Sequence, residues 1–470
     1  MSKKVLLVHP SSLFSKDWLF ARNFQLHLIT LYYFLRQNHI EVDVLDLELE
    51  LGFPNTLENI QQFPQRLTQL LQNYSFDIVG ISCYASTQYL SAVAVAKACK
   101  MLNKECKVVV GGYHATALPE DFIDQEGAFD FIVRGEGEYA LLEIYRGLYD
   151  DQGSLPRIIE GKPRDLSEGI FLDWENYKYI RPGMSHVGVA FSRGCPFRCS
   201  YCAESKLDFK YREYPVDIAL RDIRRAVEMV RPCILAFYDP LFRLDTPWGQ
   251  ELFTALAKEN FQQPIWLMTR IDMLKESHID LLSRFNVQVF LGVETGSEKM
   301  LTIMNKAKKP KEYLRKVEEN LTCINEKKVL GNFALLMNHP GETPQTVDET
   351  FNFFERILAK QRQVSVVCEH NSNFLYLPGT HVFENISYYE KEYGTVIGHK
   401  TWWKKHASHI QLAQDNIPSR GLSSKIEWKS RMQHLNDRYI FNKMATEAML
   451  FKFWFDSVYQ SYESREVTYA

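Results

Sequence analysis

Three cysteines with the spacing C-x3-C-x2-C, Cys195, Cys199 and Cys202, are the residues of this sequence most suited to chemistry. A 4Fe-4S cluster usually takes one Cys thiolate for each of its four irons. Three thiolates would therefore hold a cluster and leave one iron open to a substrate or cofactor. Gly194 and Pro196 flank the first cysteine and favour an irregular backbone around a cluster.

Two other interpretations of these cysteines remain open, a zinc site and three buried structural residues. Zinc sites generally use C-x2-C pairs and a fourth ligand, which makes the zinc interpretation the weaker one. The remaining six of the nine cysteines do not form a disulfide framework, and we expect them to be small core residues. These six are Cys83, Cys99, Cys106, Cys233, Cys323 and Cys368.

The cysteine stretch resembles the radical S-adenosylmethionine (SAM) superfamily, whose loop matches at Cys195, Cys199, Tyr201 and Cys202. The resemblance implies that SAM binds the open iron, with Tyr201 as an aromatic face beside the cluster. It also implies that one electron cleaves SAM to methionine and a 5'-deoxyadenosyl radical, which abstracts hydrogen from a C–H bond. A flavodoxin- or ferredoxin-type protein is the implied electron donor.

The composition is that of an ordinary soluble globular protein, with 470 residues, 46% hydrophobic and 24% charged. A net charge of −3 gives no field that attracts nucleic acid. The densest basic run, residues 306–311, reads as a solvated approach to a helix. No apolar run reaches the ~18 residues of a membrane span, and the first residues lack a signal-peptide pattern. We therefore expect a cytoplasmic protein without a membrane span.

Residues 1–150 alternate strand and helix patterns, which predicts a doubly wound parallel sheet (Rossmann-like). Ligands of such sheets bind outside the carboxyl ends of the strands. Loops rich in glycine and hydroxyl groups follow three predicted strands here, at residues 82–87, 111–119 and 135–138. The sequence thus predicts a ligand groove along this edge.

These loops resemble the cobalamin-binding domain that precedes the cluster domain in one branch of radical SAM enzymes. The resemblance implies cobalamin (methylcobalamin) as a cofactor, bound by Ser82, Thr87, Gly111, Gly112, His114, Gly135 and Glu136. The D-x-H-x-x-G loop that donates a histidine to cobalt in other cobalamin proteins is absent after the first strand, so no histidine ligand is expected. The alternative is an empty groove on a sheet that only docks on the next domain.

Residues 151–185 read as an ordered connector, and residues 186–380 predict a partial (β/α)6 barrel of about six strand–helix units. Polar residues at the predicted strand ends are implied by the resemblance to bind SAM: Asp239, Arg270, Glu294, Thr295 and Ser297. For the three charged residues, a structural ion pair is the alternative. Asn338 and His339 replace the usual glycine before the P-G-E-T pattern, which suggests polar side chains facing substrate.

Residues 381–470 are aromatic and mainly helical, and residues 444–459 suggest a helix buried against the barrel. Such C-terminal segments often cover the active site in this branch. Trp402, Trp403, His406 and His409 are therefore candidates for substrate contact, although packing is the favoured role.

These observations predict a cobalamin-dependent radical SAM methyltransferase that methylates an unactivated carbon of a peptide or small-molecule natural product. A second SAM would remethylate the cobalamin. One alternative keeps the cofactors but catalyses rearrangement, cyclisation or ring contraction. Another is a non-catalytic cobalamin or iron–sulfur sensor, which would form no 5'-deoxyadenosine.

Overall fold

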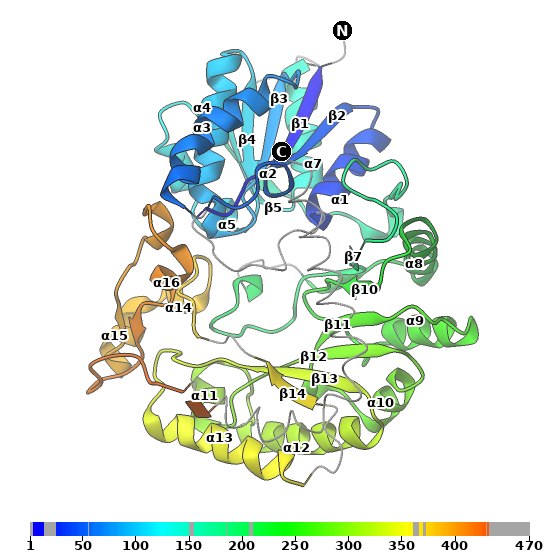
Figure 1. The fold of residues 1–470 in the computed structure, drawn as a ribbon, viewed down its shortest axis with the longest axis vertical. Helices are drawn as coiled ribbons and strands as arrows, with labels where there is room; N and C mark the ends of the chain where they lie inside the picture. Colours follow the sequence, from blue (N-terminus) through cyan, green and yellow to red (C-terminus); the bar gives the residue numbers. More distant parts are fainter. Residues whose placement is uncertain are drawn as a thin grey trace.

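The computed structural model describes residues 3–13, 25–54, 56–149, 155–184, 186–205, 210–360, 366–369, 373–428 and 430–431. Two six-stranded parallel sheets organise these residues, and helices pack on both (Figure 1). The cores of the two sheets are rich in valine, isoleucine and leucine, as expected of parallel strands that are covered by helices.

The first sheet has the order β2-β1-β3-β4-β5-β6. Its strands are β1 Lys4–His9, β2 Glu41–Asp46, β3 Ile78–Ser82, β4 Lys107–Gly111, β5 Phe131–Gly135 and β6 Ile158–Gly161. The strand order reverses between β1 and β3, which is where ligands of doubly wound sheets bind. The predicted sheet is confirmed, and β6 is a further strand within the stretch that the sequence marked as a connector.

Alternation of side chains along β1 explains how helices cover both faces of this sheet. Val5 and Leu7 join one core with helices α1 (Leu26–Gln37) and α7 (Gly137–Tyr149). Leu6 and Val8 join a second core with α3 (Leu57–Leu71) and α4 (Tyr89–Leu102).

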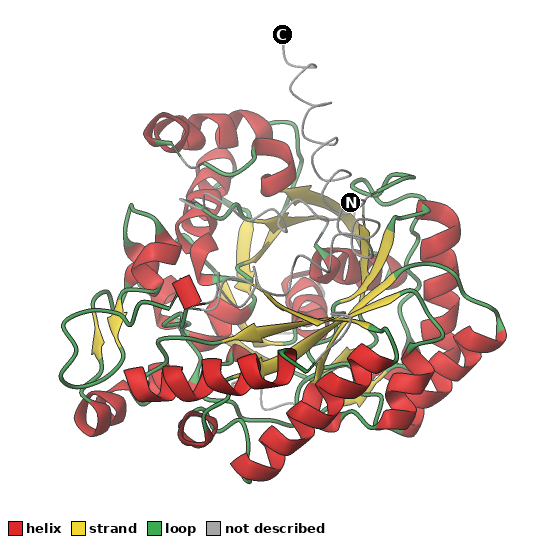
Figure 2. Cartoon of the chain, turned by 60° about the horizontal axis from the view of Figure 1, so that its bottom comes forward, coloured by secondary structure: helices red, strands yellow, loops and turns green. Residues whose placement is uncertain are grey.

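The second sheet has the order β14-β13-β12-β11-β10-β7, in which each strand pairs in parallel with the next one along the chain. Its strands are β7 His186–Val189, β10 Ile234–Phe237, β11 Ile265–Arg270, β12 Val287–Glu294, β13 Leu330–Leu335 and β14 Val366–Glu369. The intervening helices lie on its outer side (Figure 2): α8 Val216–Val230, α9 Pro247–Lys258, α10 Glu276–Leu282, α12 Pro310–Glu326 and α13 Pro344–Leu358. Buried and half-buried residues alternate strictly along β12, so one face packs on helices and the other faces inward. The predicted partial barrel is confirmed.

Most of residues 373–428 form short elements whose buried side chains join the core on the α3 and α4 side of the first sheet, whereas Ile426 and Trp428 pack in the core that contains α13. These elements are α14 His381–Glu384, α15 Ile386–Tyr393, α16 His409–Ala413 and the two-residue strands β15 Val396–Ile397 and β16 Asn416–Ile417. Trp402 and Trp403 are buried in the core that contains α3 and α4. The helix predicted at residues 444–459 lies outside the described residues.

Among the helices of the described residues, none combines the length and the apolar character that a membrane crossing requires.

Candidate active site

The cysteine loop follows β7 at one edge of the second sheet. Cys199 is buried, whereas Cys195 and Cys202 are half-buried. Burial raises the pKa of the Cys202 thiol to about 12, and the charge of Glu204 and the two neighbouring thiols act in the same direction. The three thiols are thus close enough to influence one another. Within the described ranges, no group of three or more His, Cys, Asp or Glu side chains is arranged to hold a single metal ion. Three thiolates at this spacing are a donor set of the kind that 4Fe-4S clusters use.

Ser200 fixes the middle of this loop through contacts with three distant segments. Its backbone N–H donates to the Met304 carbonyl over 2.8 Å, and its carbonyl accepts from the Val382 N–H over 3.0 Å. Its hydroxyl donates to Nε2 of His339 over 3.0 Å, while Nδ1 of His339 donates to the Pro340 carbonyl over 2.8 Å. Burial lowers the pKa of His339 to about 4, so the imidazole is neutral and suited to accepting this bond.

Asn338 and His339 are therefore structural supports. Neither is among the described residues that line the cavity discussed below. Asn338 has a φ of +60° and its side chain bonds to Asn373 and Ile426. That these polar side chains face substrate stays a prediction, and the contacts described here do not support it.

Asp239 follows β10 and lies beneath the start of the cysteine loop. Its Oδ1 accepts from the backbone N–H of Phe191 over 2.8 Å and from Ser192, both N–H and hydroxyl. Its Oδ2 is buried and has no hydrogen-bond partner among the described residues. Burial raises the pKa of this carboxyl to about 6, although the three donors oppose the shift. An acceptor oxygen is therefore left for a cationic group such as the SAM ammonium.

Arg270 is the last residue of β11 and is almost fully buried. Its Nε and Nη2 each donate over 3.0 Å to the carboxylate of Asp272, and Nη1 donates to Sγ of Cys199 over 3.6 Å. Nη2 also donates to the Lys306 carbonyl over 2.8 Å. The structural ion pair considered for Arg270 is thus present, with an additional contact to a cysteine of the predicted cluster site, and its assignment to SAM stays a prediction.

Glu294 ends β12 with a φ of +68°, at an irregularity in the pairing with β13. Its carboxylate pairs with the ammonium group of Lys306 over 2.6 Å, and the Lys306 side chain is 4% exposed. The interpretation of residues 306–311 as a solvated run is thus wrong at Lys306, which is buried because Glu294 neutralises it. Arg270 and Glu294 are brought together through Lys306.

The hydroxyls of Thr295 and Ser297 are used within the protein. The Thr295 hydroxyl bonds to the hydroxyl of Thr350 over 2.9 Å. Ser297 caps α11 (Glu298–Ile303) and donates to Glu349 over 2.5 Å. Their assignment to SAM stays a prediction with no support from these contacts.

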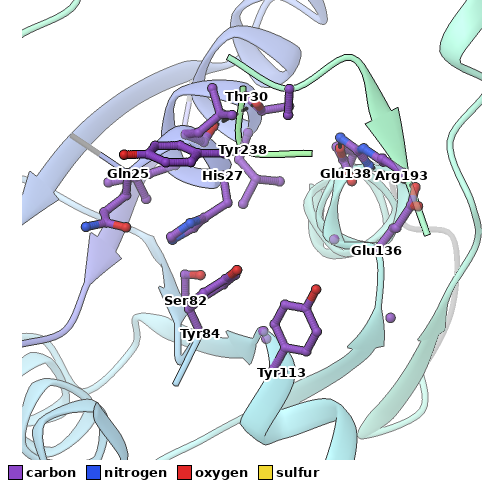
Figure 3. A pocket seen from close by; sticks show the side chains of 18 of the residues that line it. Gln25, His27, Thr30, Ser82, Tyr84, Tyr113, Glu136, Glu138, Arg193 and Tyr238 are labelled. Carbon is purple, nitrogen blue, oxygen red and sulfur yellow. Dashed lines mark hydrogen bonds and ion pairs between the residues drawn. The ribbon is translucent and has the colours of Figure 1, made fainter. Parts of the chain in front are cut away.

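One cavity of about 610 Å³ joins the carboxyl ends of both sheets. Figure 3 shows Ser82 at the end of β3, Tyr84 after it, Tyr113 after β4 and Glu136 after β5 around the cavity. Tyr238 follows β10 of the second sheet, and Arg193 lies in the segment after β7. Of the predicted cobalamin residues, five line the cavity: Ser82, Gly111, Gly112, Gly135 and Glu136. Its volume lies in the range of cofactor and ligand sites.

The other two predicted cobalamin residues do not line this cavity. The Thr87 hydroxyl bonds to the Ser12 hydroxyl over 3.2 Å. His114 is buried, with Nδ1 2.8 Å from the Ser86 hydroxyl and Nε2 3.2 Å from Asp121. Burial lowers its pKa, although Asp121 opposes the shift. We therefore interpret His114 as a support for the loop after β4.

The cysteines, Asp239, Arg270 and Glu294 are not among the described residues that line the cavity, but chain neighbours of the cysteines and of Asp239 are. Gly194 and Glu204 flank the cysteine loop, and Tyr238 and Pro240 flank Asp239. The cavity thus connects the predicted cobalamin loops to the backbone that carries the predicted cluster and SAM residues.

Glu136 and Glu138 line the cavity, but their carboxylates are bound by arginines of the following segments. Glu136 accepts from Arg193 over 2.9 Å, from the Arg164 backbone over 2.7 Å, and from Arg212. Glu138 accepts from Arg193 over 2.5 Å. Arg193 is two residues before Cys195, so this acidic loop fixes the cysteine loop against the first sheet (Figure 3).

Among the cavity residues that the sequence did not indicate are His27, Tyr84, Tyr113 and Glu204. His27 stacks on Tyr84 with ring centroids 5.0 Å apart, and its Nε2 is buried without a hydrogen-bond partner among the described residues. Tyr113 donates to Glu204, which follows the last cysteine of the loop. No spacing rule marks these residues, because they are far apart in the sequence. His27, Tyr84 and Tyr113 contact one another at the edge of the first sheet, and Tyr113 meets Glu204 where the cysteine segment packs on that edge. The orphaned nitrogen and the glycine loops fit a polar organic cofactor in this cavity.

The sequence matches two protein families in the order that the sheets suggest. Residues 27–145 match the B12 binding domain, and residues 189–354 match the radical SAM superfamily. The first range contains the strands β3, β4 and β5, which carry the cavity loops of the first sheet, and the second contains the cysteine loop itself and strands β10 to β13.

Three related proteins share about a quarter of their aligned residues with this chain. An uncharacterized methyltransferase of Pyrococcus horikoshii is 24% identical over 68% of this chain and 71% of its own length. A hopanoid C-3 methylase of Methylococcus capsulatus is 28% identical over 62% of this chain and 57% of its own length. An anaerobic magnesium-protoporphyrin IX monomethyl ester cyclase of Rubrivivax gelatinosus is 24% identical over 58% of this chain and 53% of its own length. The chain thus spans little more than half of the latter two proteins.

Two solved structures share the fold. The radical SAM methyltransferase TsrM of Kitasatospora setae, with cobalamin and a 4Fe-4S cluster bound, superimposes with a TM-score of 0.61 at 18% identity, covering 81% of this chain and 77% of its own. The cobalamin-dependent radical SAM enzyme OxsB, with aqua-cobalamin and SAM bound, gives 0.65 at 16% identity, covering 99% and 71%. The two family matches show that the chain combines a B12 binding domain with a radical SAM domain, in the fold of these two enzymes, and the cofactors of these domains are cobalamin, a 4Fe-4S cluster and SAM.

Proposed function

We propose that this chain is a C-methyltransferase that adds a methyl group to an unactivated carbon of a peptide or small-molecule natural product. The observation that carries the proposal is the cavity between the two sheets, because the loops of the B12-binding domain and the segment that enters the cysteine loop both line it. Similarity to a methyltransferase and a C-3 methylase supports methyl transfer.

In this proposal each part of the chain has a defined task. Cys195, Cys199 and Cys202 hold the cluster, and Asp239 Oδ2 accepts a hydrogen bond from the SAM ammonium. The glycine loops after β4 and β5 let cobalamin approach the backbone. When bound, these cofactors supply radical formation and a transferable methyl group. The apolar lining, including Leu7 and Val189, excludes water from the reacting carbon.

The test uses the full chain, purified anaerobically and reconstituted with iron, sulfide and cobalamin, and supplied with SAM, a reductant of the flavodoxin or dithionite class and candidate substrates. Methyl transfer predicts a product heavier by one methylene, with S-adenosylhomocysteine and 5'-deoxyadenosine formed alongside. Cys199→Ala should lose the iron and both SAM-derived products. The absence of 5'-deoxyadenosine from a fully loaded enzyme would instead indicate a sensor.

A second candidate is radical cyclisation or rearrangement with the same cofactors, favoured by the similarity to the anaerobic cyclase. It predicts 5'-deoxyadenosine without a gain of one methylene and without S-adenosylhomocysteine. The same product analysis therefore distinguishes the two reactions.

A further inference from the structure

The Arg270 guanidinium contacts one of the cysteines that would hold the cluster. Nη1 donates to Cys199 Sγ over 3.6 Å, a normal separation for a hydrogen bond to the large sulfur atom. The arginine side chain is 7% exposed. This pairing joins the end of β11 to a residue 71 positions earlier in the chain.

Three further contacts hold the guanidinium in this position. Asp272 accepts two parallel hydrogen bonds of 3.0 Å each, and the Lys306 carbonyl accepts a third over 2.8 Å. The face of the guanidinium stacks on Phe197, 3.8 Å from the ring centroid. Phe197 itself lies in the cysteine loop, so the cation and the loop form one packed unit. The fork that would bind the SAM carboxylate is already occupied by Asp272.

We propose that Arg270 is a positioning residue that raises the reduction potential of the 4Fe-4S cluster by holding a positive charge and an N–H donor against the Cys199 thiolate. Reduction adds one electron, and so one negative charge, to the cluster and its thiolates. A nearby fixed cation stabilises that state more than the oxidised state, and hydrogen bonds to sulfur act in the same direction. The proposal rests on the cluster being bound by Cys199 as proposed above.

The chain contains a matched control. Arg243, after β10, forms the same two-residue fork with Asp245, with hydrogen bonds of 3.1 and 2.8 Å. It lies over Tyr211 at 5.2 Å. Among the described cysteines, none is bonded to it. Replacing Arg243 therefore removes a similar Arg–Asp pair but leaves the guanidinium beside Cys199 in place.

The test is a redox titration of the reconstituted full chain followed by electron paramagnetic resonance, with dithionite as the reductant and SAM absent. Arg270→Gln should lower the ratio of reduced to oxidised cluster at a fixed potential at least tenfold, which corresponds to about 59 mV for one electron. Arg270→Lys, which keeps the charge but not the fork, should give a smaller decrease. Arg243→Gln should titrate as the wild type does.

A wild-type midpoint in Arg270→Gln with a full complement of iron would overturn the proposal. If SAM affinity then falls at least tenfold, Arg270 binds the SAM carboxylate as the sequence suggests. Loss of the cluster from both Arg270 variants would make Arg270 a structural residue and would also overturn the proposal. A wild-type chain that takes up no cluster contradicts the proposed function itself, so the two failures are distinguishable.

Discussion

At Gly112 the backbone leaves no space for a side chain. Its φ is +98°, and a Cβ atom there would lie 2.5 Å from the Cys83 carbonyl oxygen. Gly111, its neighbour, has no positive φ, and its nearest contacts would be atoms of Val133 at 3.7 Å. The two glycines of this loop thus have different roles: the first leaves the cavity open, and the second allows the turn.

We predict that Gly112→Ala lowers the free energy of unfolding by about 1–3 kcal/mol, because it forces both a clash and a strained backbone. Gly111→Ala should leave the free energy of unfolding almost unchanged. Urea unfolding followed by circular dichroism measures both. Equal stabilities of the two variants would contradict the assignment of the turn to Gly112.

Asp239 provides a prediction about pH. Because burial raises its pKa to about 6, its free oxygen is charged above that pH and neutral below it. We expect SAM binding to strengthen as the pH rises through 6. Asp239→Asn keeps an acceptor for Phe191 and Ser192 but loses the charge, which should weaken binding about 10- to 100-fold at pH 7.5, the equivalent of about 1.5–3 kcal/mol.

Anaerobic equilibrium binding of labelled SAM between pH 5 and 8 measures this effect. The asparagine variant should show a flatter pH profile, with a melting temperature close to that of the wild type. Wild-type SAM affinity in the variant at pH 7.5 would remove Asp239 from the SAM site.

At the scale of elements, strand ends were the most predictable feature. The alternation of strands and helices predicts both sheets, and polar residues at strand ends point to Asp239, Arg270 and Glu294. Their partners were not predictable, because periodicity carries no information about long-range pairs. Lys306 shows this limit: it lies in a basic run that resembles a surface, yet it is buried against Glu294.

The His339 turn should contribute to the acid sensitivity of the fold. Its pKa is about 4 in the folded protein and 6.5 in the unfolded chain, so the unfolded state binds more protons between these values. Stability from this residue is present above pH 6.5 and is lost as the pH falls toward 4, by about 3 kcal/mol in total.

His339→Gln keeps an acceptor near Ser200 without a group that titrates. Its free energy of unfolding should therefore fall less steeply than that of the wild type between pH 6.5 and 4.5. Urea unfolding at several pH values tests the prediction, and parallel profiles for the two proteins would contradict it.

At the scale of the whole molecule, two features unite the sheets. Residues 373–428 contact the first sheet, where Trp403 donates to Asp121 over 2.6 Å, and also the cysteine loop, where Val382 binds Ser200. Packing is thus the observed role of Trp402 and Trp403. The domain boundaries at residues 150, 185 and 380 stay predictions, and β6 shows that the connector also contributes to the first sheet.

The second uniting feature is the network of Glu136 and Glu138 with Arg193. Burial alone would raise the pKa of Glu138, but Arg193 and Arg164 hold it below its usual range. The carboxylate is therefore charged at neutral pH. The two glutamates follow β5 of the first sheet, and Arg193 lies at the start of the cysteine loop. The network therefore fixes the cysteine loop relative to the first sheet.

We predict that Glu138→Gln destabilises the docking of the two sheets by about 3 kcal/mol, since it leaves part of a buried arginine charge uncompensated. Thermal unfolding should then separate into two transitions, one for each sheet. Glu259→Gln removes an exposed ion pair with Arg224 between helices α9 and α8 of the second sheet. It should lower the free energy of unfolding by at most about 1 kcal/mol, with a single transition retained. Scanning calorimetry compares the two variants. Identical curves would mean that packing alone, including that of Trp403, holds the sheets together, and the ion network would then serve only to orient the cysteine loop.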